Sequence, residues 1–144
     1  MKRIILVLLA LVAIGVVAFG VHRRLEMNAK KNRQGTYKTK LRSFTEALTP
    51  GMTRKQVEDY FHANKVAYSE ECCVVFDNSD HRHSFDELVK VGQEDHPWYC
   101  GENNVYIAFQ FADFKKQVPD WQIKDNDLDT LTAITIYNQL ENCL

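Results

Sequence analysis

The residues best suited to chemistry gather between positions 80 and 100. The stretch "DHRH" places His81 and His83 two residues apart, and His96 and Cys100 follow. Imidazole and thiolate groups bind zinc, so His81 and His83 with His96 or a cysteine could form a metal site. The His-X-His spacing is common, and neither a Cys-X-X-Cys nor a His-Glu-X-X-His motif accompanies it. We therefore favour histidines on a surface loop, and we expect no metal or other cofactor.

The cysteines allow two kinds of chemistry. Cys100 close to His96 could act as a nucleophile beside a base. An even number of cysteines, four in this chain (Cys72, Cys73, Cys100 and Cys143), instead favours disulfides in an oxidising compartment. The side chains of adjacent cysteines diverge in an extended chain, so we expect Cys100 to bond Cys72 or Cys73 and Cys143 to bond the other. Four reduced thiols in a cytosolic domain are the alternative.

Aromatic residues in the same region suggest recognition rather than catalysis. "HPWYCGENN" contains Trp98 and Tyr99, and Trp121 follows in a second long connection. Exposed aromatics dominate the binding energy of many interfaces, so these three residues are candidates for contact with a partner protein. Alternatively, they fold back onto a small core. The aspartates of "DNDLD" lack the glycine and glutamate of a calcium loop and predict a solvated turn.

Two helices and three strands must position these residues. Apolar residues at Tyr37, Leu41, Phe44 and Leu48 predict a helix over residues 33–48. Pro50 and Gly51 end this helix. Thr53 then caps a second helix that reaches about residue 64, with Gln56 at the capping-box position.

Alternation of apolar residues predicts strands over residues 66–76, 105–111 and 130–140. Ser84 could cap a short helix that continues to Val91 and ends at Gly92. This order, two helices followed by three strands, predicts an α+β fold in which a helical hairpin packs on a three-stranded antiparallel sheet.

The N-terminal part predicts a membrane association. Residues 4–21 are an uninterrupted apolar run, about as long as a bilayer core requires, with Lys2 and Arg3 before it. We expect a single-pass inner-membrane anchor at 1–21, a basic juxtamembrane segment at 22–42 and a small domain at 43–144. Cleavage near Gly20 would instead release a secreted protein. The basic residues favour a cytoplasmic domain, whereas the "MKR" start and the cysteines favour export to the periplasm.

Charge is divided unevenly along the chain. Residues 22–42 contain eight Lys or Arg and one Glu, whereas residues 43–144 contain eight Lys or Arg and eighteen Asp or Glu. We expect the apolar run and the basic segment to contact membrane lipid, since each basic residue near an anionic surface contributes roughly 1 kcal/mol. A solvated helix face is the alternative for 22–42. The acidic remainder argues against a nucleic-acid partner.

The turn "PGMTRKQVEDYF" resembles the outer-membrane assembly lipoprotein family SmpA/OmlA, which includes BamE. Gly51, Met52, Thr53 and Val57 match its motif, but the lipid-attachment cysteine is absent. The resemblance covers about a third of the chain and implies a helical hairpin, a three-stranded sheet and a non-enzymatic protein that binds envelope proteins or lipid. We expect a membrane-tethered binding protein with a structural or assembly role. The alternatives are an inhibitor-like binding module, which shares this layout, and a thiol- or metal-dependent enzyme using His81, His83 and Cys100.

Overall fold

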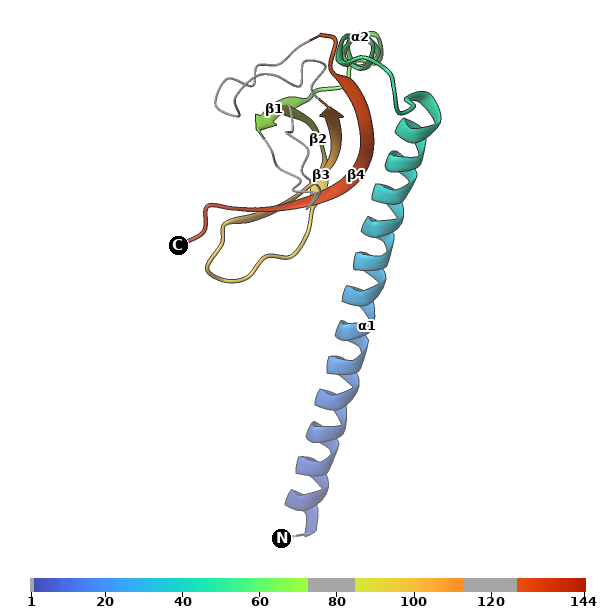
Figure 1. Cartoon of the computed structure of the whole chain (residues 1–144). Helices are drawn as coiled ribbons and strands as arrows, with labels where there is room; N and C mark the ends of the chain where they lie inside the picture. The colour runs from blue at the N-terminus through green and yellow to red at the C-terminus, as the bar shows by residue number, and fades with distance from the viewer. Residues whose placement is uncertain (1, 73–84, 113–126) are drawn as a thin grey trace. The chain divides into compact units, whose positions relative to one another are not determined.

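The computed structural model describes residues 2–72, 85–112 and 127–144, and the side chains among them apart from those of residues 2–13, 72 and 85. The chain divides into two compact units, residues 1–36 and residues 37–144 (Figure 1). The first unit consists of the larger part of helix α1 (Lys2–Ala47). The last three turns of α1, helix α2 (Arg54–Asn64) and all the strands belong to the second unit.

The prediction of a single-pass membrane protein is wrong for the part of the chain that the structure describes. No helix there combines the length and the apolar content that crossing a bilayer requires. The helix does not end where the apolar run ends, because α1 continues without a break through Arg23, Arg24, Lys30 and Lys31 to Ala47.

The predicted turn between the two helices is confirmed. Leu48 and Phe44 are buried at the end of α1, and Gly51 adopts a positive φ of 94° that suits glycine. The Thr53 side chain accepts a hydrogen bond from the Gln56 backbone, and the Gln56 side chain accepts one from the Thr53 backbone. This capping box starts α2 at Arg54, and Lys65 ends the helix in the left-handed conformation.

In the described residues the sheet has four antiparallel strands rather than the predicted three. β1 (Ser69–Cys72), β2 (Phe85–Gln93), β3 (Glu102–Ala112) and β4 (Thr130–Glu141) lie in the order β1-β2-β3-β4. Figure 1 shows them as one curved sheet with α2 at one end. The additional strand is β2, for which the sequence predicted a helix ending at Gly92. Leu88 and Val89 are both buried, in two separate apolar clusters, because β2 presents alternate residues to the two faces of the sheet.

The main core lies between the helices and one face of the sheet. Three phenylalanine rings, Phe44 from α1, Phe61 from α2 and Phe109 from β3, meet edge to face at centroid distances of 4.9–6.2 Å. The other buried members of this cluster come from the same elements and from the adjoining strands and turn: Leu48, Val57, Val89, Ile107, Phe111 and Leu131. These contacts hold α2 and the end of α1 on the sheet.

Candidate functional site

An aromatic loop, residues 94–101, connects β2 with β3. Its ends are held by ordinary backbone hydrogen bonds: Glu94 N donates to Asn103 O at 2.9 Å, and Cys100 N donates to Pro97 O at 3.0 Å. Trp98 is 88% exposed and Tyr99 is 45% exposed, and their rings contact each other edge to face at 5.9 Å. The sequence left open whether these residues fold back onto the core. Trp98 does not.

A disulfide between Cys100 and Cys143 fixes the end of the aromatic loop to the end of β4. The prediction that Cys100 and Cys143 each bond to Cys72 or Cys73 is therefore wrong. Pairing of β3 with β4 places Glu102 opposite Glu141, and this register brings the flanking cysteines together. Leu144 N also donates to Tyr99 O at 2.8 Å. Cys73 and the side chain of Cys72 lie outside the described part of the chain.

The disulfide removes the thiol that an enzyme built on Cys100 would need, because a bonded sulfur forms no thiolate nucleophile. His81, His83 and Trp121 lie outside the described residues. Among residues 2–72, 85–112 and 127–144, no group of His, Cys, Asp or Glu is arranged to hold a metal ion. The motif residues Gly51, Met52, Thr53 and Val57 form the turn and the start of α2, where Val57 is buried in the core.

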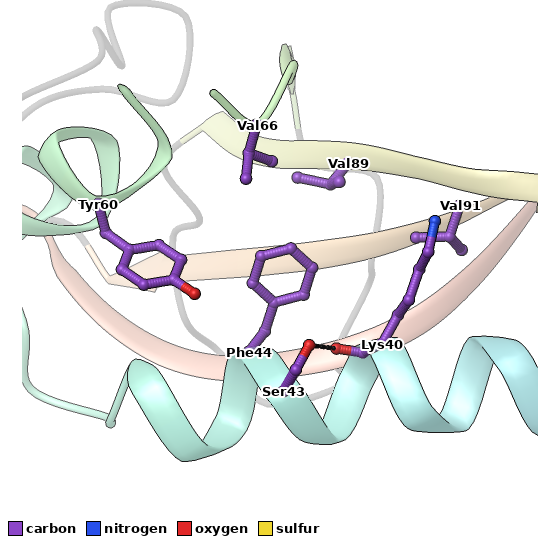
Figure 2. Close-up of a pocket in the computed structure, with 7 residues that line it drawn as sticks. All are labelled: Lys40, Ser43, Phe44, Tyr60, Val66, Val89 and Val91. Carbon is purple, nitrogen blue, oxygen red and sulfur yellow. Dashed lines mark hydrogen bonds between the residues drawn. The ribbon is translucent and has the colours of Figure 1, made fainter. Parts of the chain in front are cut away.

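A recess of about 340 Å³ lies between α1, α2 and β2. Figure 2 shows Lys40 extending from α1 with its ammonium group beside Val91, while the Tyr60 hydroxyl points toward Phe44. Such a recess, with apolar walls and one cation at its rim, can accept an apolar group that carries a negative charge. Its lining comprises Lys40, Ser43, Phe44, Tyr60, Val66, Val89 and Val91.

A polar network that the sequence did not predict lies on the sheet face opposite the main core. The Tyr106 hydroxyl donates to Glu141 Oε1 at 2.9 Å. Burial and this contact with Glu141 raise the pKa of Tyr106 to about 12. Two hydrogen bonds lower the pKa of Glu141, the one from Asn104 having the larger effect and the one from Tyr106 the smaller. Asn104 also donates to Glu102 Oε2 at 2.9 Å, so the network joins β3 to β4.

A buried ion cluster lies where α2 meets the sheet. Arg54 is fully buried, and its Nη1 donates to Glu87 Oε1 at 3.0 Å. Its Nη2 lies 3.8 Å from Asp129 Oδ2, and the guanidinium stacks 4.0 Å from the centroid of the Phe111 ring. No local sequence pattern predicts this cluster, because its members are far apart in the chain.

The buried ion cluster is better suited to holding elements together than to catalysis. It connects the first turn of α2 to β2 and to the residue that precedes β4, and Arg54 N also donates to Asp129 O at 2.7 Å. Both carboxylates lie within 4 Å of the Arg54 guanidinium, Glu87 at 3.0 Å and Asp129 at 3.8 Å. We therefore regard the aromatic loop as the candidate functional site, because it presents its side chains to solvent.

Comparisons of the chain with protein-family models, with curated proteins and with solved structures give no match. The resemblance of residues 50–61 to the SmpA/OmlA family therefore stays a prediction.

Proposed function

We propose that this chain is a non-catalytic binding domain that recognises a partner protein through the aromatic loop. The observation that carries the proposal is the exposure of Trp98, 88%, at a position held by a disulfide. Leaving a tryptophan side chain in water forgoes the free energy gained by burying it, which is roughly 1.5–3 kcal/mol for a large apolar side chain. A binding partner recovers that free energy.

The disulfide supports this proposal through conformational entropy. A flexible loop must be ordered when it binds, and ordering each mobile side chain costs about 0.5–1.5 kcal/mol. Here the residue after Tyr99 is covalently fixed to the end of β4, and Leu144 N holds the Tyr99 carbonyl. The loop backbone is thus ordered before a partner arrives. Edge-to-face contact between the two rings limits their rotation in the same way.

The SmpA/OmlA resemblance implies the class of partner. Members of that family assemble with other envelope proteins, so the partner we propose is an envelope protein and the role is structural or assembly-related. The disulfide fits such a role, because disulfides persist in oxidising compartments.

The proposal can be tested by site-specific photocrosslinking in the cells that make this protein. A photoreactive amino acid at position 98 should give one discrete crosslinked protein. The same amino acid at Lys38, an exposed residue of α1, is the matched control and should not give that product. Once the crosslinked protein is identified, Trp98→Ala should weaken its binding by about tenfold or more, as expected for a hot-spot aromatic.

The same variants also separate binding from folding. Trp98 is exposed, so Trp98→Ala should change the free energy of unfolding by less than about 0.5 kcal/mol. Equal crosslinking from positions 98 and 38, or full binding by the alanine variant, would refute the aromatic loop as the binding surface.

A further inference from the structure

Within the part of the chain that the structure describes, the outer edge of β4 is a long backbone edge that no other strand covers. In the described residues β4 pairs with β3 on one side, and on the other side its first two residues meet the turn at Gly51–Thr53. From Thr132 to Leu140, no strand of the described residues lies beside this outer edge. Since alternate residues of a strand direct their N–H and C=O groups to opposite sides, about half of the residues in this segment direct theirs to a side where no described strand pairs with them.

Proteins usually protect such edges. Lysine, proline, a bulge or a very short strand prevents pairing with another chain. The opposite edge strand, β1, has only four residues, and two of them are glutamates. The segment "TAITIYNQL" of β4, residues 132–140, contains no charged residue and no proline. It is rich in threonine, isoleucine and tyrosine, which favour strands. Its one irregularity lies at its start, beside Gln110 and Phe111 of β3.

Two apolar side chains on this segment are also exposed. Ile136 is 37% exposed and Leu140 is 47% exposed, although both lie in a regular strand. In the register with β3 they pair with Ile107 and Asn103, so they lie on one face of the sheet. A strand added beside β4 would cover both side chains and pair the free backbone groups.

We propose that the chain forms a twofold-symmetric dimer in which the β4 edges of two copies pair antiparallel, centred on Ile136. This centre is the one that pairs the whole segment from Thr132 to Leu140 with itself. Each Ile136 then lies opposite its symmetry mate, Ile134 lies opposite Asn138, and Thr132 lies opposite Leu140. The result is a continuous eight-stranded sheet.

The occupant we commit to is a second copy because the segment is self-complementary in charge. Antiparallel self-pairing places symmetry-related residues near one another, so a charged residue close to the axis would face a like charge. No residue from Thr132 to Leu140 carries a charge. Glu141 lies just outside the segment, and the outward backbone groups of Leu131 are already bonded to Gly51 and Met52. The free edge and the uncharged segment therefore coincide.

This inference does not rest on the proposed function. Trp98 lies on the loop between β2 and β3, so Trp98→Ala should leave dimerisation unchanged. Conversely, loss of the dimer leaves the aromatic loop intact in each copy. The two proposals therefore fail independently.

Sedimentation velocity of the full chain over a range of concentrations tests the dimer. The wild type should show a reversible monomer–dimer equilibrium. Ile136→Lys places two ammonium groups opposite each other at the axis and should raise the dissociation constant by at least about tenfold. Asn138→Lys, at a more polar position, should act in the same direction if Ile136→Lys impairs folding. Thr45→Lys adds the same charge at an exposed residue of α1 and should have no effect.

Crosslinking tests the register. Ile136→Cys should form an intermolecular disulfide on mild oxidation, because residues directly opposite in a ladder have Cα atoms about 4.5–5.5 Å apart. Leu140→Cys should not, since the two copies of residue 140 would lie about 26 Å apart along the strands, at about 3.3 Å per residue. A monomeric wild type, a dimer unaffected by both lysine variants, or equal crosslinking at 136 and 140 would each overturn the proposal.

Discussion

Of the six glycines, Gly92 has the closest neighbour, the ring of Tyr37. A Cβ atom at this position would lie 2.6 Å from Cε1 and 2.7 Å from the hydroxyl oxygen of Tyr37. The ring cannot move away freely, because the Tyr37 hydroxyl donates to Gln93 O at 2.9 Å. Gly92 also lies at a bulge in β2, because the register with β3 shifts between Lys90 and Gly92. The absence of a side chain at Gly92 thus lets Tyr37 of α1 pack directly on β2.

Gly92→Ala should lower the free energy of unfolding by about 1–3 kcal/mol, as overpacking in a core typically does. Chemical denaturation monitored by circular dichroism measures this change. Gly35→Ala is the control, because nothing lies within 4 Å of a Cβ there and alanine favours a helix. A Gly92→Ala variant as stable as the wild type would show that the ring and strand separate easily.

Tyr106 gives stability a dependence on alkaline pH. Its pKa is raised from 10.0 to about 12 by burial and by Glu141, so the folded state retains the phenolic proton after the unfolded chain has lost it. The stabilising effect is complete below about pH 10 and is lost as the pH rises from about 10 to 12. Tyr106→Phe should remove this part of the pH dependence.

The measurement is the denaturant midpoint as a function of pH for the wild type and Tyr106→Phe. The difference between the two proteins should narrow as the pH rises through that range. Tyr99→Phe, the same change at a tyrosine that is 45% exposed, is the matched control. Parallel pH profiles for the wild type and Tyr106→Phe would contradict the assigned role.

Arg54 joins helix α2 to two different strand regions. Arg54→Leu would leave Glu87 and Asp129 buried without their shared counterion, and breaking a buried pair in this way typically costs about 3–5 kcal/mol. The free energy of unfolding from denaturant titration should fall by that amount. Lys55→Ala, at the next residue, removes only the exposed pair with Asp59 and should cost less than about 1 kcal/mol.

Arg54→Leu combined with Glu87→Leu tests the explanation. If the uncompensated carboxylate is the cause, the double variant should recover part of the loss, because one buried charge is removed with its partner. A double variant that is less stable than Arg54→Leu alone would show that Glu87 stabilises the fold in another way.

Elements whose signals are local could be predicted, and elements specified by distant contacts could not. Thr53 and Gln56 cap α2 through atoms three residues apart, so the sequence defined that helix. Residues 84–91 carry an equally plausible local pattern for a helix, with Ser84 as a cap and acidic residues behind it. Glu87 is instead held by Arg54, thirty-three residues earlier, and the strand forms. The disulfide was mispredicted for the same reason, because it depends on the register of β3 with β4.

The Cys100–Cys143 disulfide closes a loop that contains both β3 and β4. Crosslinking residues 43 positions apart restricts the unfolded chain, and loops of this size typically contribute about 2–4 kcal/mol. Replacing both cysteines by serine should lower the free energy of unfolding by that amount. Denaturation of the wild type in the presence of reductant should reproduce the result, while reductant should lower the stability of the double variant by less than it lowers that of the wild type.

The disulfide variant also tests how the aromatic loop is ordered. Hydrogen exchange at the amides of residues 98–101 should accelerate in the double serine variant, while the central residues of β3 stay protected. If exchange in the loop does not change, backbone hydrogen bonds alone order it.

The buried ion cluster has a consequence for how the protein is made. Ribosomes release the chain from its N-terminus, so Arg54 emerges long before Glu87 and longer still before Asp129. Until both carboxylates have emerged, docking α2 would bury a cation without its partners, which is costly. Nascent chains stalled before Asp129 should therefore keep the Arg54 region accessible to protease, and compaction of the domain should begin only once β4 is available.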